Sequence, residues 1–188
     1  MSKYIKIFGK RAKKVLERQV DSDTKNKVLK SFLFFLEKNK KKILNQNKKD
    51  IKFAKQKNLK LNLIDRLLLT NKKLEAIKKS VRDIIKLEDP VNKVLEKWRR
   101  PNGLFIKKVS TPIGVIGVIY ESRPNVTSDI SSLCFKSGNA VILRGGSEAM
   151  NTNKILASLF RKALKLNKVN PDFVQFINTR NRKIVDYM

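Results

Sequence analysis

The stretch "GVIGVIYESRPNVTSDISSLCFKSGNAVILRGGSEA" (114–149) decides the fold. Residues 114–120 are nearly all apolar and β-branched, which predicts a strand that is buried on both faces, and Ala-Val-Ile-Leu-Arg (140–144) predicts a second buried strand. Between them, Pro124 suits the first turn of a helix, and Gly138 suits its end. A strand, a helix and a second strand in this order predict a parallel pair with a right-handed crossover.

The same pattern continues toward the C-terminus. Residues 148–166 have the apolar spacing of a second helix, and residues 172–178 have the composition of a third strand. Asn178 or Thr179 is the expected start of a further helix. The region 111–188 is therefore expected to form a βαβαβ core around a parallel sheet.

The first half of the chain has a different period. Residues 1–89 carry apolar residues at helical spacing, and Asp89-Pro90 ends this region. Two alternating runs on either side of Pro101-Asn102-Gly103 then predict a β-hairpin over 92–110. The expected helices are 26–44, begun by Asp23 or Thr24, a weaker one over 48–57, and 71–85, begun by Thr70.

The formal net charge of +28 is the most unusual property of the composition. Such a charge favours nucleic-acid binding, but it is spread along the chain, and 33 lysines stand against 11 arginines. Arginine is the residue better suited to bidentate phosphate and base contacts. Any binding to nucleic acid is therefore expected to be electrostatic and without sequence preference.

Several classes of protein are disfavoured by what the sequence lacks. The 188 residues contain no apolar run long enough to span a membrane, and the N-terminus lacks a secretory signal. A single cysteine and no histidine argue against disulfides and against a metal site. We therefore expect a protein of the reducing cytoplasm, and we expect Cys134 to be a core residue rather than a nucleophile.

The loop Arg-Gly-Gly-Ser-Glu (144–148) follows the second predicted strand. Two glycines allow close backbone approach and unusual dihedral angles, Arg144 adds a planar cation, and Ser147 and Glu148 start the next helix. This pattern suits a phosphate, but it also suits an ordinary turn with Ser147 as the helix cap. The loop contains neither a G-x-G-x-x-G fingerprint nor a P-loop.

The loop after the first strand holds Glu121, Ser122, Arg123 and Asn125. Polar residues at the end of a buried strand suit a ligand site, although capping of the next helix explains them equally well. Composition and spacing alone leave both alternatives open for this loop.

"IGVIYESRPNVT" (116–127, with Ile113-Gly114 upstream) and "SGNAVILRGGSEA" (137–149) resemble the gamma-glutamyl phosphate reductase family of the aldehyde dehydrogenase superfamily. Flanking segments such as "WRRPNGL" agree, and the resemblance covers essentially the whole chain. It implies a Rossmann-like cofactor-binding unit of the aldehyde dehydrogenase type, with 92–110 in the place of an oligomerisation flap. It also implies that 1–188 is only the N-terminal portion, with the catalytic domain and its nucleophilic cysteine beyond Met188.

The resemblance assigns roles to individual positions. The residues implied to bind the cofactor are Ile119, Tyr120, Glu121, Arg144, Gly145, Gly146, Ser147 and Glu148. Arg144 takes the place of a lysine that contacts the adenosine ribose and its phosphate. Ser122 matches an asparagine directed at the substrate carbonyl, and Arg123 and Asn125 are implied to face the substrate phosphate or carboxylate.

The implied reaction is the NADPH-dependent reduction of L-glutamyl 5-phosphate to L-glutamate 5-semialdehyde and phosphate, a step of proline biosynthesis. A cysteine thiolate attacks the acyl phosphate, and hydride from NADPH then releases the aldehyde. Residues 1–188 alone are expected to be inactive. The resemblance further implies a homo-oligomer and association with glutamate 5-kinase. The alternatives are another aldehyde or acyl-phosphate dehydrogenase and a basic nucleic-acid-binding module.

Overall fold

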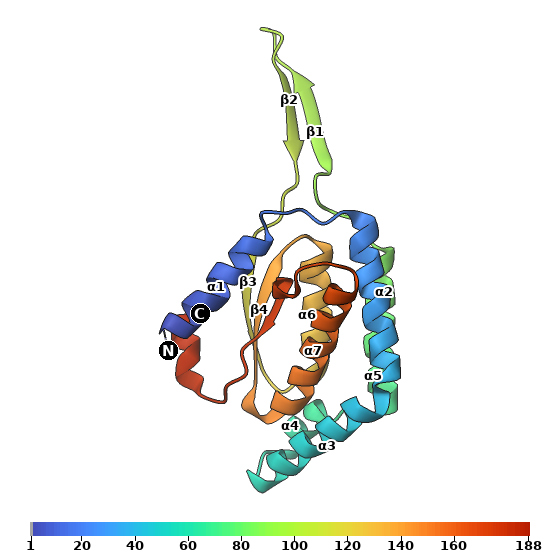
Figure 1. The fold of residues 1–188 in the computed structure, drawn as a ribbon, viewed down its shortest axis with the longest axis vertical. Coiled ribbons are helices and arrows are strands. Elements are labelled where there is room, and N and C mark those ends of the chain that lie inside the picture. Colours follow the sequence, from blue (N-terminus) through green and yellow to red (C-terminus); the bar gives the residue numbers. More distant parts are fainter. Residues whose placement is uncertain (1) are drawn as a thin grey trace.

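The computed structural model describes residues 2–188 (Figure 1). Five helices precede the first strand: α1 (Ser2–Val15), α2 (Ser22–Lys38), α3 (Lys40–Gln56), α4 (Leu61–Leu67) and α5 (Asn71–Lys86). A hairpin of β1 (Val94–Arg99) and β2 (Phe105–Val109) follows. The remaining elements are β3 (Val115–Tyr120), α6 (Pro124–Lys136), β4 (Ala140–Gly145), η1 (Ser147–Ala149), α7 (Met150–Leu166), η2 (Pro171–Phe173), β5 (Val174–Phe176) and η3 (Arg182–Tyr187).

The three later strands form the predicted parallel sheet in the order β3-β4-β5. Val115 of β3 pairs with Ala140 of β4, and Val141 of β4 pairs with Val174 of β5. The crossover helices α6 and α7 connect successive strands, so all three strands end at the same edge of the sheet. This confirms the α/β fold class and the strand–helix alternation.

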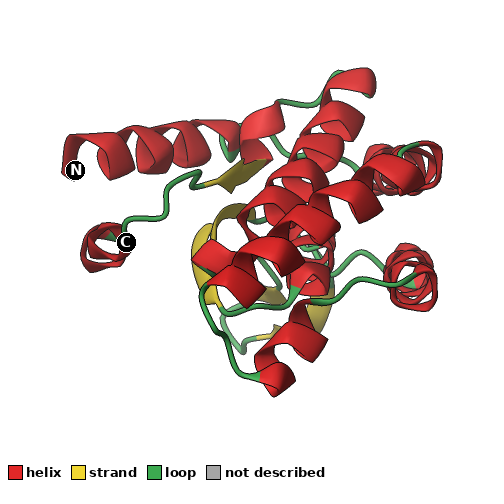
Figure 2. Cartoon of the chain, turned by 90° about the horizontal axis from the view of Figure 1, so that it is seen from below, coloured by secondary structure: helices red, strands yellow, loops and turns green. Residues whose placement is uncertain are grey.

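Helices cover the two faces of the sheet unequally. α1 packs against one face, and α6 and α7 pack against the other, with α2, α3 and α5 forming an outer layer over them (Figures 1 and 2). Every residue of the central strand β4 is buried, as predicted. In the residues described, no helix is both long and apolar enough to cross a bilayer.

The prediction that β3 is buried on both faces is wrong. Its residues alternate between exposed and half-buried, and 53% of the Ile119 surface is accessible. β3 lies at the edge of the sheet, and α1 makes most of its sheet contacts with β4. An apolar strand at an edge stays open on the face that no helix covers.

Two predicted helix boundaries in the first half are also wrong. α2 is capped by Asp21, whose carboxylate accepts hydrogen bonds from the backbone nitrogen (2.8 Å) and the hydroxyl (2.7 Å) of Thr24. The expected single helix over 26–44 is divided at Asn39, whose side-chain Nδ2 donates to the carbonyl of Phe35 at 2.8 Å. Such a local side-chain bond competes with helix continuation. The cap at Thr70 is confirmed.

The hairpin projects away from the body of the molecule (Figure 1). Its strands pair antiparallel, with Trp98 opposite Ile106, and Gly103 adopts the left-handed conformation with φ of 85°. That conformation at the turn is the reason for the glycine. The hairpin exposes six large apolar side chains: Val94, Leu95, Trp98, Leu104, Phe105 and Val109.

The C-terminal elements are shorter than predicted. β5 spans three residues because Asn170 caps a 3-10 turn that replaces the expected start of the strand. Arg161 of α7 holds this turn, since its Nη1 donates to the carbonyls of Pro171 (2.8 Å) and Val174 (2.7 Å). The next helical turn, η3, is capped by Asn181 rather than by Asn178 or Thr179.

Candidate functional site

A pocket of about 720 Å³ opens at the carboxyl ends of β3 and β4, and we call it the strand-end pocket. Its lining residues come from both strand-end loops and from two other parts of the chain: Phe53, Lys57, Leu59, Leu63, Ile119, Tyr120, Glu121, Ser122, Arg144, Gly146, Ser147, Glu148, Arg182, Val185 and Asp186. All residues predicted to bind a cofactor line it except Gly145. The fold therefore brings the two predicted loops together at one pocket.

Arg144 is the most informative residue of the pocket. It pairs with Ile119 across the β3–β4 ladder and is only 6% exposed. Its Nη1 donates to the carbonyl of Gly145 at 2.9 Å, but its Nε and Nη2 are buried without a hydrogen-bond partner. Buried guanidinium nitrogens are normally paired, so this arrangement fits an anionic ligand that accepts from both atoms.

Gly145 and Gly146 are required because neighbouring side chains lie close to their Cα atoms, and not because their dihedral angles are unusual. A Cβ atom on Gly145 would lie 2.2 Å from Nδ2 of Asn153 and 3.0 Å from the Tyr120 ring. A Cβ atom on Gly146 would lie 2.1 Å from Oε1 of Glu148. Neither glycine has a positive φ angle, which corrects that part of the expectation.

The amino end of α7 is already occupied by a carboxylate from α3. Asp50 is fully buried, and its Oδ1 accepts from the backbone nitrogen (3.1 Å) and Nδ2 (2.8 Å) of Asn151. Its Oδ2 accepts from the nitrogen (2.7 Å) and the hydroxyl (2.6 Å) of Thr152. The expectation that Ser147 and Glu148 start this helix is therefore wrong: they form a separate 3-10 turn, and α7 begins at Met150.

Glu148 ties the two strand-end loops together. The Ser122 hydroxyl donates to Oε1 of Glu148 at 2.5 Å, and the Ser147 hydroxyl donates to Oε2 at 3.1 Å. Ser122 is buried, and its proton is engaged with this carboxylate. In this arrangement Ser122 orients Glu148, whereas the resemblance implied that it faces a substrate carbonyl.

A buried hydrogen-bond chain lies behind the pocket. The Tyr120 hydroxyl and the Thr127 hydroxyl are 2.7 Å apart, and the Thr127 hydroxyl donates to Oδ1 of Asn153 at 3.0 Å. Burial raises the pKa of Tyr120 well above its ordinary value of 10, so its ring is neutral. This chain fixes the tyrosine ring beside Gly145 and shapes the floor of the loop.

Arg123 and Asn125 do not reach the strand-end pocket. They line a neighbouring pocket of about 440 Å³ between α4, α5 and the start of α6. Ser122 and Arg123, although consecutive, thus contribute to different pockets. The residues implied to face the substrate are divided between the two sites.

Cys134 lies in the hydrophobic core on α6, and burial raises the pKa of its thiol to about 11. A thiol with this pKa is almost wholly protonated at neutral pH, which makes it a poor nucleophile. Among residues 2–188, no group of three His, Cys, Asp or Glu side chains is arranged to hold a metal ion.

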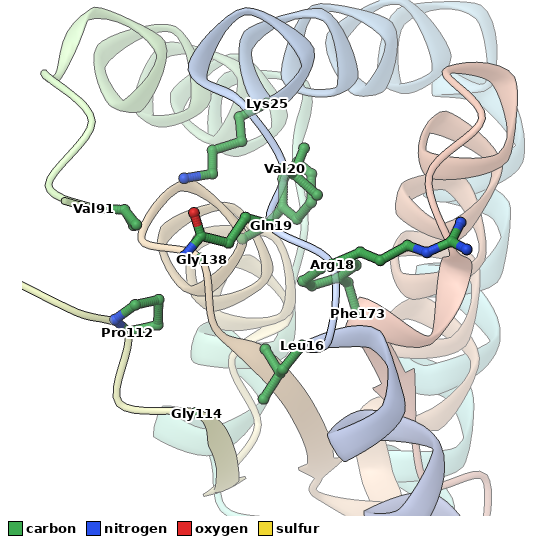
Figure 3. A pocket seen from close by; sticks show the side chains of 11 residues that line it. Leu16, Arg18, Gln19, Val20, Lys25, Val91, Pro112, Gly114, Gly138 and Phe173 are labelled. Carbon is green, nitrogen blue, oxygen red and sulfur yellow. The ribbon is translucent and has the colours of Figure 1, made fainter.

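A third pocket, of about 210 Å³, lies at the opposite end of the sheet (Figure 3). Lys25 and Gln19 reach toward Gly138, while the guanidinium of Arg18 points away. The Lys25 ammonium is paired with the Asp89 carboxylate at 2.7 Å, so its charge is already balanced. This pocket contains none of the predicted site residues, and it lies by the amino ends of the strands.

Seven residues of the strand-end pocket were missed by the sequence reasoning. They come from α3, from α4 and its preceding loop, and from η3, which lie more than 50 residues before or more than 30 residues after the strand-end loops. They comprise Phe53, Lys57, Leu59, Leu63, Arg182, Val185 and Asp186. Packing joins these segments, for example where the Arg180 guanidinium stacks 4.3 Å above the Phe53 ring. No local pattern signals such a contact.

Comparison with known proteins identifies the relatives of this chain, although no family model matches it. Gamma-glutamyl phosphate reductase from Thermoanaerobacter sp. (strain X514) is 46% identical over 186 residues, which is 98% of this chain and 45% of that protein. The crystal structure of the Thermotoga maritima gamma-glutamyl phosphate reductase superposes with a TM-score of 0.91 at 39% identity, over 95% of this chain and 44% of that one.

The chain is homologous to the N-terminal portion of gamma-glutamyl phosphate reductases. The Saccharomyces cerevisiae reductase agrees, with a TM-score of 0.88 and 32% identity over 96% of this chain and 48% of its own length. An acetylating aldehyde dehydrogenase from Geobacillus thermoglucosidasius shares the fold, with a TM-score of 0.70 at 12% identity over 99% of this chain and 39% of its own. The chain thus spans less than half the length of these gamma-glutamyl phosphate reductases.

Proposed function

We propose that this chain supplies the dinucleotide site of a gamma-glutamyl phosphate reductase and that its preferred cofactor is NADPH. The observation that carries the proposal is the buried guanidinium of Arg144, whose Nε and Nη2 lack partners within the strand-end pocket. A phosphate monoester offers the acceptors that these two atoms require. Because NADPH has a 2′-phosphate and NADH does not, an arginine here favours NADPH.

The other residues of the strand-end pocket suit the rest of a dinucleotide. The exposed side chain of Ile119 and the ring of Phe53 offer apolar surfaces for a planar base. The carboxylates of Glu121 and Glu148 are acceptors for ribose hydroxyls. Gly146 lets the backbone approach a phosphate closely. When bound, NADPH supplies the hydride.

The proposed reaction is the reduction of L-glutamyl 5-phosphate to L-glutamate 5-semialdehyde with release of phosphate, in proline biosynthesis. It is proposed for the complete enzyme, because the relatives are more than twice as long as the segment that this chain matches. The poor nucleophilicity of Cys134 supports the expectation that a cysteine outside residues 1–188 attacks the acyl phosphate.

We also infer that the projecting hairpin mediates self-association. Its apolar side chains, among them Trp98 and Phe105, are exposed, and within residues 2–188 no other helix or strand lies alongside this arm (Figure 1). Exposed apolar surfaces of this kind mark protein–protein contacts. Sedimentation of the intact protein with Trp98→Lys, which is expected to weaken the oligomer, tests this inference.

The test of the cofactor proposal is a comparison of NADPH and NADH affinities in the intact protein. Arg144→Ala is expected to weaken NADPH by about 10- to 100-fold, the value of a buried charge-assisted hydrogen bond, and NADH by less. Arg144→Lys restores part of the NADPH affinity because it keeps the charge without the bidentate geometry. Cofactor fluorescence titrations give the dissociation constants.

The matched control is Arg99→Ala, which removes the same charge from an exposed position on β1. In so basic a protein this control separates a specific site from general attraction of anions. Equal losses for NADPH and NADH on Arg144→Ala exclude contact with the 2′-phosphate. No loss for either shows that residues 144–148 form an ordinary turn.

A further inference from the structure

We propose that the pocket beside the dinucleotide site binds the α-amino-acid end of the substrate, with Asp129 accepting from its α-ammonium group. This inference rests on the proposed function for the identity of the substrate. The pocket lies between α4, α5 and the start of α6 and has a volume of about 440 Å³. We call it the headgroup pocket; the residues that matter here are Arg66, Lys73, Ile77, Arg123, Asn125 and Asp129.

The Asp129 carboxylate has one oriented oxygen and one unpaired oxygen. Its Oδ2 accepts from Nδ2 of Asn125, one helical turn earlier, at 3.1 Å. Its Oδ1 is buried and has no hydrogen-bond partner within the described residues. A shielded carboxylate oxygen requires a donor, and an ammonium group provides three. Asn125 is then a positioning residue, since it holds Asp129.

Three cationic residues line the same pocket as this acid: Arg66, Lys73 and Arg123. Within residues 2–188, the side chains of Arg66 and Arg123 form no hydrogen bond or ion pair, whereas Lys73 donates to the carbonyl of Asp65 at 2.6 Å. The helix α6 also begins here, at Pro124, without a side-chain cap. Free guanidinium groups beside an uncapped helix start suit a carboxylate.

The combination of charges identifies the ligand class better than either sign alone. A chain with a net charge of +28 offers cations on many surfaces, so a cationic rim by itself selects nothing. An unpaired acid oxygen and two free arginines that line one pocket fit a zwitterion, the α-ammonium and α-carboxylate of an amino acid. The buried side chain of Ile77 provides an apolar wall for the methylene groups between the two ends.

The position of the headgroup pocket agrees with this assignment. Ser122 lines the strand-end pocket, and the next residue, Arg123, lines the headgroup pocket. The loop between β3 and α6 therefore separates the two pockets. A substrate held by its amino-acid end in one pocket can direct its acyl phosphate toward the other, where the hydride is donated.

The experiment measures the binding of L-glutamate and glutarate by calorimetry. Glutarate carries two negative charges and L-glutamate carries one, so general attraction to this basic protein favours glutarate. The proposal expects the opposite order: the wild type binds L-glutamate at least about 10-fold more tightly, since a charge-assisted bond to Asp129 is added. Asp129→Asn removes that preference and leaves glutarate binding unchanged.

Two further variants complete the design. Asp83→Asn, an exposed acid of α5, keeps the wild-type preference, whereas Arg123→Ala weakens both probes because both carry the carboxylate. If the wild type prefers glutarate, or if Asp129→Asn keeps the preference for L-glutamate, the proposal is overturned.

Failure of the proposed function is recognised separately. The intact protein is assayed for NADPH oxidation with L-glutamyl 5-phosphate formed in situ. Selective L-glutamate binding without NADPH oxidation contradicts the reductase but supports an amino-acid pocket. Oxidation of NADPH with no change in KM on Asp129→Asn supports the reductase and contradicts the headgroup pocket.

Discussion

The two ends of the parallel sheet differ in whether their buried charged groups have hydrogen-bond partners. At the amino ends, Lys25 is paired with Asp89 at 2.7 Å, and Lys136 donates to Oδ1 of Asn26 at 2.7 Å. At the carboxyl ends, two nitrogens of Arg144, Nδ2 of Asn153 and Oδ1 of Asp129 are buried without partners. The buried lysines at the amino ends are thus paired within the chain, whereas Arg144 and Asp129 at the carboxyl ends keep unpaired atoms. Among the described residues, the hydroxyls of Ser128 and Ser132 on α6 are unpaired as well.

This difference separates structural charges from binding charges. Removing one member of a satisfied buried pair leaves the other unpaired and destabilises the fold. Removing a group that has no partner costs no interaction in the free protein, so its loss appears in ligand binding instead. Substitutions at the two ends are therefore expected to have effects of different kinds.

The largest effect on stability is expected at Asp50. This buried carboxylate lies at the carboxyl end of the sheet, but unlike Arg144 it has hydrogen-bond partners for both of its oxygens. Asp50→Ala removes the acceptor of four hydrogen bonds at the start of α7 and is expected to cost about 3–5 kcal/mol of unfolding free energy. Urea denaturation measures the loss, and the exposed Asp83→Ala provides a control of about 0.5 kcal/mol or less. A small loss at Asp50 means that this cap is not needed.

The next largest effect is expected at Lys25. Lys25→Met leaves the Asp89 carboxylate, 16% of whose side chain is exposed, without its cation and is expected to cost about 2–4 kcal/mol. The second substitution in Lys25→Met/Asp89→Asn restores part of the loss, because the unpaired charge is removed. NADPH affinity stays unchanged in both variants. A double variant as unstable as the sum of the single ones contradicts a coupled pair.

Arg144→Met provides the opposite result at the carboxyl end. It removes a buried charge with two unpaired nitrogens, but also the bond from Nη1 to the Gly145 carbonyl (2.9 Å), so the unfolding free energy is expected to change by no more than about 1 kcal/mol in either direction. The same variant loses NADPH affinity. Thermal denaturation without ligand, followed by cofactor titration, measures both. A loss of stability as large as that of Lys25→Met removes the distinction between the two ends.

Local patterns in the sequence were sufficient for most of the sheet. The apolar residues 140–143 predicted β4, and Gly138 predicted the end of the crossover helix before it, because buried strands and helix ends have strong local preferences. The exposed face of β3 was not predictable in this way. Exposure depends on which elements cover a strand, and the run 114–120 carries no such information.

Only those parts of the site that lie close together in the sequence could be predicted from it. The sequence predicted that the two strand-end loops lie together because parallel strands end at one edge of a sheet, and both loops line one pocket there. Asp50 was not found, since it caps a helix that begins 100 residues later. The pocket of Asp129 was hidden for the same reason: Arg66 and Lys73 line it together with Asp129 although they lie more than 50 residues earlier in the chain, and α5 packs against α6.

The smallest effect is expected at Cys134, which lies toward the amino ends of the strands, since its carbonyl accepts from the Asn139 nitrogen, just before β4, at 2.8 Å. Burial raises the pKa of its thiol from 9.0 to about 11, because the native interior disfavours the thiolate. The unfolded chain therefore loses this proton near pH 9 and the native protein near pH 11. Stability is unaffected at neutral pH and falls between these values, by about 1 kcal/mol at pH 10.

Urea denaturation of the wild type and of Cys134→Ala from pH 7 to pH 10.5 isolates this contribution, since the two proteins have all other titrating groups in common. The wild type is expected to lose stability relative to the variant only above about pH 8.5, where the unfolded thiol begins to ionise. A difference between the two proteins that stays constant over the whole range shows that the native thiol ionises normally. Such a thiol is accessible and reactive, and Cys134 is then a candidate for binding or chemistry rather than a packed core residue.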